Sequence, residues 1–504
     1  MAEGRGQPHT PSKQTSPWFP TSLPSRQATQ AVVSRVPRTT PTEFKAAVDA
    51  ATAAFPAWRA TPLPARQRVM FRLQALIRDH TDALAACITA EQGKTLADAR
   101  GDVFRGLEVV EYAAGIAPAL MGGYTEHVAG GMDTFSIRQP LGVVAGVCPF
   151  NFPAMIPLWM FPLAVTAGNT FVLKPSERDP GAAVLLAGLA QEAGLPGGVL
   201  NLVHGGPETV GALCDDPAIA ALSFVGSTPG GRAVAARAAR AGKRIQVNMG
   251  AKNHAVILPD AHAGATLSAL TGAAFGAAGQ RCMAISVAVF VGPPGVSRPW
   301  IDELVQRAGA LVVGAGAEPG TDVGPMISPA ARARAEGLVA DAVAAGATAA
   351  LDGRGVVVPG YERGNFLGPT ILAGVTPAMA AYREEVFGPV LACLEAATLD
   401  DAVALVNACP YGNGTAIFTR SGAAARRFQT GVEVGMVGVN VPIPVPLPFY
   451  SFTGWKDSFA GDLPMYGAAG IEFFTRTKTV TTNWRDADEA TGVRAGGLDG
   501  VGAS

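Results

Sequence analysis

Cys282 lies in the segment FGAAGQRCMAIS, in which small residues precede the cysteine and Arg281 stands directly beside it. Small residues allow two backbone segments to approach closely, and a neighbouring guanidinium favours the thiolate form of a cysteine. Because the thiolate is the nucleophilic form, this pattern indicates a cysteine that forms a covalent intermediate. A free cysteine taken alone is more often a buried apolar residue, so the surrounding motifs have to decide between the two interpretations.

The other cysteines and the histidines point neither to a disulfide framework nor to a metal site. Six cysteines and six histidines are spread along 504 residues without a CxxC pair, an HxxxH pair or a mixed cluster. Scattered cysteines of this kind are typical of a reducing compartment. We therefore predict free thiols and no bound metal.

The charge balance argues against nucleic acid and membrane surfaces as partners. Lys and Arg number 39 and Asp and Glu number 40, so no long-range field of one sign exists. The stretch from Gln139 to Leu173 carries no charged residue and is long enough for a membrane span. Pro149, Pro153, Pro157 and Pro162, however, would break a spanning helix repeatedly, so we predict a buried strand, a loop and a helix start.

Six motifs, in this order along the chain, carry a resemblance to a known family: PFNFPAMIPLWM, FVLKPSE, ALSFVGST, NMGAKNHAVI, GAAGQRCMA and EEVFGPV. Their order and spacing resemble the aldehyde dehydrogenase superfamily over about residues 35–484. The forms NMGAKNH, FGAAGQRCMA, PYGNGTAIFT and VNVPIPVPLPF are similar to the methylmalonate-semialdehyde dehydrogenase branch. That branch is acylating: it passes the acyl group to coenzyme A, and it serves valine catabolism.

The resemblance implies catalytic roles for Cys282 and Asn151. Cys282 would attack the aldehyde carbonyl to form a thiohemiacetal, and hydride transfer to NAD would leave a thioester. Asn151 would hold the oxyanion together with the backbone N–H of Cys282, and donors preorganised toward developing charge are often the largest catalytic contribution. An isolated Asn between two prolines would otherwise be a turn or cap residue.

The resemblance also implies a cofactor site. Lys174 and Glu177, in the KPSE motif, match positions that hold the adenosine ribose, and a carboxylate there favours NAD because it repels the 2′-phosphate of NADP. Without the resemblance, this motif would be an ordinary helix start. The glycines from Gly206 to Gly211 are a weak phosphate signal, since they do not form GxGxxG. Five further residues are assigned to the cofactor site: Phe152, Arg178, Ser227, Glu385 and Phe387.

Asn248 departs from the pattern of the hydrolytic members. Most of these carry Glu at the start of the corresponding motif, and that Glu activates the water that cleaves the thioester. A neutral amide cannot take up a proton at neutral pH. Because water attacks slowly, the acyl enzyme persists until a better nucleophile reacts with it. The thiolate of coenzyme A is such a nucleophile, since it can exchange one thioester for another without a strong base.

Two arginines match positions that hold a substrate carboxylate in the resembling family. Arg105 lies in GDVFRGLEVVEYA, Arg281 precedes the nucleophile, and a guanidinium binds a carboxylate through paired hydrogen bonds. The resemblance at these two positions therefore implies that the substrate is a three-carbon semialdehyde acid. Arg105 could equally be a helix-surface residue paired with Glu108 or Asp102.

The sequence therefore predicts NAD-dependent, CoA-acylating oxidation of methylmalonate or malonate semialdehyde to propionyl-CoA or acetyl-CoA with loss of carbon dioxide. One alternative is a hydrolytic aldehyde dehydrogenase that uses a base other than Asn248. A second alternative is a non-catalytic binding protein that keeps the fold.

The elements that must position these residues follow from the hydrophobic pattern. From Pro41 to Ala117 the apolar residues recur at helix spacing, and from Gly142 short apolar runs alternate with helix-like segments. Such alternation is typical of a parallel, doubly wound sheet. We predict an α/β fold of the aldehyde dehydrogenase type, with two doubly wound parallel-sheet domains and a β oligomerisation arm. The segment IEFFTRTKTVTTNW is predicted to be an exposed strand within that arm.

The predicted domain organisation has five parts. Residues 1–27 form a mobile leader, residues 28–124 and 143–255 the NAD-binding domain, completed by about 453–470, and residues 256–452 the catalytic domain. Residues 125–142 and 471–487 form the arm, and residues 488–504 a tail. Likeness suggests a homotetramer, as a dimer of dimers. We predict a cytoplasmic protein, or one of the mitochondrial matrix if the leader is a transit peptide.

Overall fold

The first sheet has six strands in the order β19-β9-β8-β5-β6-β7. The computed structural model describes residues 21–22 and 25–484. All neighbouring pairs are parallel except β19 with β9. The strands are β5 (Val143–Val147), β6 (Thr170–Lys174), β7 (Leu200–Leu202), β8 (Ile219–Val225), β9 (Arg244–Asn248) and β19 (Phe459–Gly461).

Helices cover both faces of this sheet because its central strands are apolar on both sides. In β5 every residue is buried, and Val144 packs into one hydrophobic cluster while Val143 and Ala145 pack into another. The surrounding helices are α1 (Pro41–Ala60), α2 (Leu63–Asp79), α3 (Thr81–Gln92), α4 (Leu96–Ala114), α5 (Met155–Thr166), α6 (Gly181–Glu192), α7 (Pro207–Asp215) and α8 (Thr228–Arg240), with the short η1 (Ala117–Leu120) after α4.

The helical pattern predicted from residue 41 onward is confirmed. Helix α1 begins at a capping box, in which Thr40 and Glu43 satisfy each other's backbone N–H groups, and it buries Phe44 and Val48. The proline-rich stretch after residue 139 contains β5, α5 and β6, as predicted, and every residue of α5 is buried. Among residues 21–22 and 25–484, no helix has the length and apolar character needed to cross a membrane.

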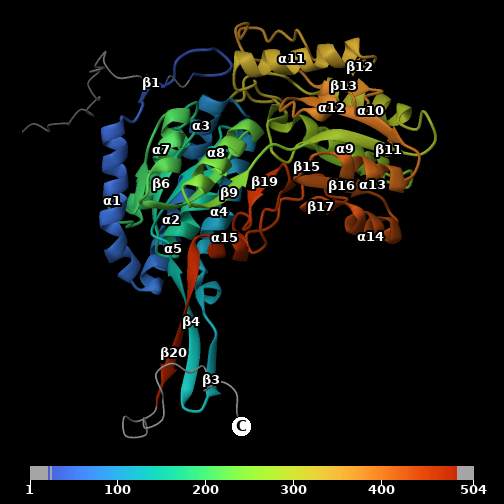
Figure 1. Cartoon of the computed structure of the whole chain (residues 1–504). Helices are drawn as coiled ribbons and strands as arrows, with labels where there is room; N and C mark the ends of the chain where they lie inside the picture. Colours follow the sequence, from blue (N-terminus) through green and yellow to red (C-terminus); the bar gives the residue numbers. More distant parts are fainter. Residues whose placement is uncertain (1–20, 23–24, 485–504) are drawn as a thin grey trace, which may run out of the picture.

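The second sheet has seven strands in the order β12-β13-β14-β11-β10-β16-β17, and only β12 runs antiparallel to its neighbour. It therefore confirms the expected second α/β unit (Figure 1). Its strands are β10 (Asn253–Ile257), β11 (Ile285–Val291), β12 (Thr348–Leu351), β13 (Thr370–Ala373), β14 (Val390–Ala396), β16 (Gly414–Phe418) and β17 (Met436–Val439). Its helices are α9 (Ala263–Phe275), η2 (Gly276–Gly279), α10 (Arg298–Gly309), α11 (Pro329–Ala344), α12 (Ala380–Arg383), α13 (Leu399–Ala408) and α14 (Gly422–Gly431).

A three-stranded antiparallel sheet extends away from the rest of the molecule (Figure 1). It consists of β3 (Tyr124–Ala129), β4 (Met132–Pro140) and β20 (Thr475–Asn483). The strand predicted for the last segment begins later than expected, because Ile471 and Phe473 belong to helix α15 (Gly467–Phe473) and are buried in the core. From Thr475 the alternating polar residues do form a strand, and it pairs with β4 along its full length.

The remaining strands are short. β1 (Thr21–Ser22) pairs with β2 (Val36–Pro37), and β15 (Tyr411–Gly412) pairs with β18 (Trp455–Lys456). Gln27, at the end of the predicted leader, is buried, and its side chain hydrogen bonds to the Glu91 carbonyl and to Asn365. Most of that leader and the predicted tail lie outside the described residues. The domain boundaries stay predictions.

Candidate active site

A cavity of about 1140 Å³ lies where the carboxyl ends of the first sheet's strands meet loops of the second sheet. Ligands of open α/β sheets bind at this edge of the strands. The volume exceeds the roughly 300–1,000 Å³ of pockets for drug-sized ligands, so an extended molecule is accommodated. The candidate residues that line the cavity are Asn151, Lys174, Glu177, Arg178, Ser227, Cys282, Glu385 and Phe387.

The loop that carries Cys282 has an unusual backbone. After helix α9, the residues Ala277, Ala278 and Gly279 have φ angles of 50°, 53° and 67°, all in the left-handed region. A Cβ atom on Gly279 would lie 2.1 Å from the carbonyl oxygen of Gly388. Glycine is therefore required here for the close approach of two loops, which is the role that the small residues of this motif suggested.

Two asparagine side chains fix the main chain at the cysteine. The amide of Asn253 donates to the Cys282 carbonyl at 2.9 Å and to the Ala284 carbonyl at 2.9 Å. The amide of Asn413 donates to the same Cys282 carbonyl at 3.0 Å. Neither residue is recognisable as functional from the sequence, although Asn253 stands in NMGAKNH and Asn413 in PYGNGTAIFT. No signal within the single sequence marks them, because their role depends on where the fold places the Cys282 carbonyl.

The electrostatics at Cys282 differ from the sequence expectation. Burial, together with the nearby carboxylate of Glu385, raises the pKa of the Cys282 thiol to about 12. Arg281 opposes this increase only weakly, because its guanidinium forms an ion pair with Asp98 on α4 and bonds the Gly272 carbonyl at 3.4 Å. Arg281 lowers the pKa as the sequence suggested, but burial and Glu385 outweigh it, so the free protein carries little thiolate at neutral pH.

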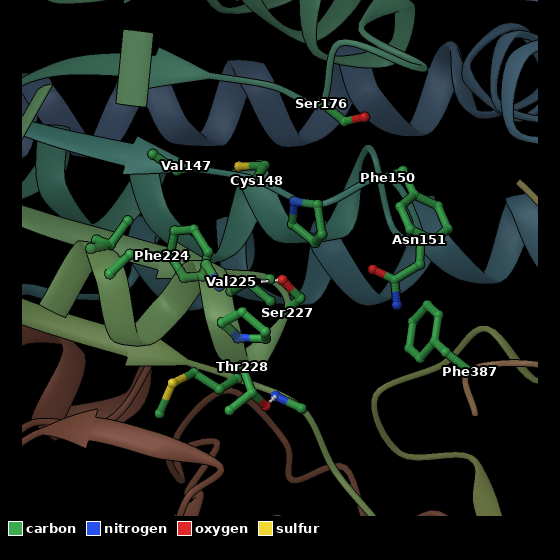
Figure 2. A pocket seen from close by; sticks show the side chains of 18 of the residues that line it. Val147, Cys148, Phe150, Asn151, Ser176, Phe224, Val225, Ser227, Thr228 and Phe387 are labelled. Carbon is green, nitrogen blue, oxygen red and sulfur yellow. Dashed lines mark hydrogen bonds between the residues drawn. The ribbon is translucent and has the colours of Figure 1, made fainter. Parts of the chain in front are cut away.

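Asn151 is held in a loop between β5 and α5 and points into the cavity, toward Phe387 (Figure 2). Its side chain is buried, and its Nδ2 donates to the Gln280 carbonyl at 3.0 Å. An amide nitrogen has two hydrogens, so one donor remains for a bound molecule. Phe150 meets the Phe387 ring edge to face, with 5.8 Å between the ring centroids.

The opposite end of the cavity has groups suited to a ribose and to phosphates. Lys174 Nζ donates to Glu177 Oε2 at 2.8 Å. Burial alone would raise the pKa of Glu177, but this lysine outweighs it and the pKa is lowered, so the carboxylate is ionised at neutral pH. Ser227 caps helix α8 and Gly206 precedes helix α7, so two helix N-termini face the cavity. Backbone N–H groups at such ends favour anions.

Glu385 and Phe387 follow helix α12. The Glu385 carboxylate accepts a hydrogen bond from the Ala251 N–H at 3.0 Å, which joins the loop after α12 to the loop between β9 and β10. Phe387 has a φ of 54°, a rare backbone conformation for an aromatic residue. The two side chains therefore occupy fixed positions at the end of the cavity that also contains Cys282.

A model of the aldehyde dehydrogenase family matches residues 14–480. The chain belongs to the aldehyde dehydrogenase family. Within that family it is 63% identical over 459 residues to a mitochondrial methylmalonate-semialdehyde dehydrogenase [acylating] of Arabidopsis thaliana, covering 91% of this chain and 75% of the relative. It is 55% identical to a mitochondrial methylmalonate-semialdehyde/malonate-semialdehyde dehydrogenase [acylating] of Rattus norvegicus, covering 92% of this chain and 86% of the relative.

Solved structures agree with this assignment. A putative methylmalonate-semialdehyde dehydrogenase of Sinorhizobium meliloti complexed with NAD superposes with a TM-score of 0.92 at 45% identity, covering 95% of this chain and 97% of that chain. A methylmalonate-semialdehyde dehydrogenase of Oceanimonas doudoroffii gives the same TM-score and identity, covering 95% and 98%. The predicted family and the predicted fold class are confirmed.

Three predicted site residues of this aldehyde dehydrogenase do not line the large cavity. Phe152 packs under the ammonium of Lys94, 4.3 Å from the ring centroid, because it follows Asn151 and turns to the other side of the loop. Arg105 is half-exposed on α4 and pairs with Glu108 at 2.9 Å, the surface pairing that the sequence left open. Arg281 is directed toward Asp98.

Asn248 stands at the end of β9 and is 4% exposed. Neither polar atom of its side chain has a hydrogen-bond partner among the residues that the structure describes. Buried polar groups are usually satisfied, so this amide without a partner is unusual, although Asn248 is not among the described residues that line the large cavity. The same described part of the chain contains no cluster of three or more His, Cys, Asp or Glu side chains that could hold a metal ion.

Proposed function

We propose that this chain catalyses the NAD-dependent, CoA-acylating oxidation of malonate and methylmalonate semialdehyde to acetyl-CoA and propionyl-CoA, with loss of carbon dioxide. One observation carries the proposal. Cys282 and Asn151 line the same cavity, while position 248, where hydrolytic members of the family carry a base, holds a buried amide. The names of the Arabidopsis and rat relatives support the same reaction.

The cavity fits NAD in size and in the chemistry of its walls. Glu177 would accept hydrogen bonds from the two hydroxyls of the adenosine ribose, and Lys174 would hold the carboxylate in place. The N-termini of α7 and α8 would face the pyrophosphate. Glu385 and Phe387 would orient the nicotinamide end near Cys282. When bound, NAD supplies the acceptor for the hydride that leaves the substrate carbon.

The protein's own groups would then act on the aldehyde in turn. The Cys282 thiol loses its proton to solvent, and the resulting thiolate sulfur forms a bond to the carbonyl carbon while the electron pair of the carbonyl double bond moves to the oxygen, which becomes negatively charged. The free N–H of Asn151 and the backbone N–H of Cys282 donate to that oxygen. The Arg281 carbonyl lies in the same peptide unit as the Cys282 N–H and accepts a hydrogen bond from the Ala284 N–H at 3.0 Å, which limits rotation of that N–H.

Release of the acyl group would depend on a thiol because Asn248 cannot activate water. An amide is not a base at neutral pH, whereas the thiolate of coenzyme A attacks a thioester without help from one. The Cys282 sulfur is the leaving group and becomes a thiolate again. The β-carboxylate is lost as carbon dioxide because the thioester carbonyl accepts the electron pair of the broken carbon–carbon bond, and the resulting enolate takes up a proton from solvent at carbon to give the acetyl or propionyl group.

The test is product analysis with malonate semialdehyde and NAD, in the presence and absence of coenzyme A. We expect acetyl-CoA at steady state with coenzyme A, and without it a single burst of NADH of about one equivalent per subunit, followed by slow turnover. Free acid formed equally fast without coenzyme A would favour a hydrolytic enzyme. No NADH under either condition would favour the non-catalytic binding protein.

Arg105 is proposed to bind the substrate carboxylate. Its guanidinium is paired with Glu108 on the surface of α4, so a substrate anion would exchange one carboxylate partner for another. Arg281 is already held by Asp98, and its assignment to the same carboxylate stays a prediction.

The Arg105→Ala variant is expected to lose about 10- to 100-fold in kcat/KM with malonate semialdehyde, because a hydrogen-bonded ion pair is worth about 1.5–3 kcal/mol. With propanal, which has no carboxylate, kcat/KM should remain within about twofold. The matched control is Arg100→Ala, since Arg100 lies on the same helix and pairs with Asp82. An equal loss on both aldehydes would remove Arg105 from substrate binding.

The assembly and the location of the chain are also proposals. The arm of β3, β4 and β20 extends from the body, and its exposed edge strands suit pairing with a second copy, in line with a homotetramer built as a dimer of dimers (Figure 1). The Arabidopsis and rat relatives are named mitochondrial, which favours the mitochondrial matrix over the cytoplasm. The predicted leader that would direct the chain there lies mostly outside the described residues.

A further inference from the structure

Lys94 is a fully buried lysine whose ammonium contacts the loop between β5 and α5, which carries Asn151. It stands between α3 and α4, and its side chain is 1% exposed. Its Nζ donates to the carbonyl oxygen of Asn151 at 2.6 Å and to Asp102 Oδ2 at 3.1 Å. The ring of Phe152 lies 4.3 Å from the same nitrogen. The hydrogen bonds and the cation–π contact of Lys94 Nζ are thus made with Asp102 and with Asn151 and Phe152, and the buried Asp179 is close enough to interact with it electrostatically.

Asp102 joins the same loop from its other end. Its carboxylate is fully buried on α4, and Oδ1 accepts a hydrogen bond from the Met155 N–H at 2.7 Å. The N–H of Met155 is the first of helix α5, so it has no partner within that helix. One ion pair thus holds both sides of the segment from Asn151 to Met155.

Asn151 is fixed on two sides. Lys94 holds its backbone carbonyl, and the Gln280 carbonyl, two residues before Cys282, accepts from its side-chain amide. Gln280 is itself anchored, because its Oε1 accepts from the Ile327 N–H at 2.9 Å. A continuous series of buried contacts therefore runs from Asp102 through Lys94 and Asn151 to the loop of the nucleophile.

A buried ion pair is poor evidence for stability, since well-packed apolar residues can replace such pairs without loss. A fixed direction for an oxyanion donor, in contrast, has a large effect, because a displacement of about 1 Å at a reacting group can cost about 100-fold in rate. We propose that Lys94 and Asp102 are positioning residues that set the orientation of Asn151 for the oxyanion. This inference rests on the proposed function, in which Asn151 acts at the oxyanion.

The test compares two neutral double variants of the full chain. In Lys94→Gln/Asp102→Asn the side-chain amide at position 94 still donates to the Asn151 carbonyl. In Lys94→Met/Asp102→Asn the side chain has similar length and no donor. Both variants remove the two charges of the Lys94–Asp102 pair together, and burial raises the pKa of the neighbouring Asp179, which favours its neutral form, so both are expected to fold. The measurements are the rate constant of the NADH burst with malonate semialdehyde, the Kd for NAD and the midpoint of thermal unfolding.

We expect the burst of the Met variant to be about 10- to 100-fold slower than that of the Gln variant, with equal Kd for NAD and equal unfolding midpoints. The same pair of variants in an Asn151→Ala background should differ by less than about twofold, because the donor acts through Asn151. If the Met variant does not fold, Asp102→Asn alone is the second test. Its burst rate is expected to lie between that of the unmodified enzyme and the roughly 10- to 100-fold lower rate expected for the Met variant.

Three results would overturn the proposal. Equal burst rates of the Gln and Met variants, with a normal burst in the unmodified enzyme, would reject the positioning role and leave the proposed function standing. A difference that persists without the Asn151 amide would show that the lysine acts elsewhere. Absence of a burst in the unmodified enzyme would reject the proposed function and this inference with it.

Discussion

The Cys282→Ala variant is expected to lose NADH formation by on the order of 10⁴- to 10⁶-fold, the range observed when a covalent nucleophile is removed. Alanine has no atom that can bond to the aldehyde carbon, so neither the covalent adduct nor the thioester can form. NAD should still bind with an unchanged Kd, because the groups proposed for the ribose and the pyrophosphate lie elsewhere in the cavity. Steady-state NADH absorbance and intact-mass spectrometry of quenched protein measure the two effects.

Cys148→Ala is the matched control. Cys148 lines the same cavity but is 4% exposed and has a thiol packed against the sulfur of Met160. Burial also raises the pKa of this thiol. Its removal is expected to change the rate by less than about threefold. An acyl adduct on the Cys282→Ala variant would place the nucleophile elsewhere. The same conclusion would follow if the Cys148→Ala variant were as inactive as the Cys282→Ala variant.

The Asn151→Ala variant is expected to lower kcat by about 10²- to 10³-fold, the usual cost of removing one oxyanion donor. The KM for the aldehyde should change less than kcat does, because the donor contacts charge that develops only in the transition state. The measurement is the single-turnover rate of NADH formation at saturating NAD and aldehyde.

Asn201→Ala is the comparison for this variant. Asn201 also uses Nδ2 to bond a backbone carbonyl, that of Gly198 at 2.7 Å, and it does not line the cavity. A similar fall in kcat for both variants would mean that the loss comes from a general disturbance of the first sheet. A fall in Asn151→Ala that appears entirely as a higher KM would assign the amide to ground-state binding.

The fold was largely predictable because its signals are local. Apolar spacing in α1 and alternating runs from β5 onward follow from residues that are near each other in sequence. The end of the chain was less predictable, since IEFF reads as a strand by alternation. Ile471 and Phe473 are helical because both are buried in the core that α5 and the neighbouring helices form, and tertiary packing overrides a weak local pattern.

The candidate site was predictable in its members but not in its contacts. The motifs identified Cys282 and Asn151, and the structure brings them to one cavity. The partner of Arg281 could not be inferred, because Asp98 is 183 positions away in the sequence and only the packing of α4 against the nucleophile loop joins them. The adjacency of Arg281 to Cys282 in sequence suggested that Arg281 lowers the pKa of the thiol, which it does, but the burial that outweighs this effect could not be inferred from adjacency.

The contact between Gly279 and the carbonyl of Gly388 has a consequence for motion in the active site. Two stretches of main chain meet there with no side chain between them, so neither can move toward the other, and no rotamer change can adjust their spacing. Cys282 follows one stretch and Phe387 precedes the other. The sulfur and the aromatic ring consequently share one rigid frame, and thermal fluctuations that shift the first should carry the second along.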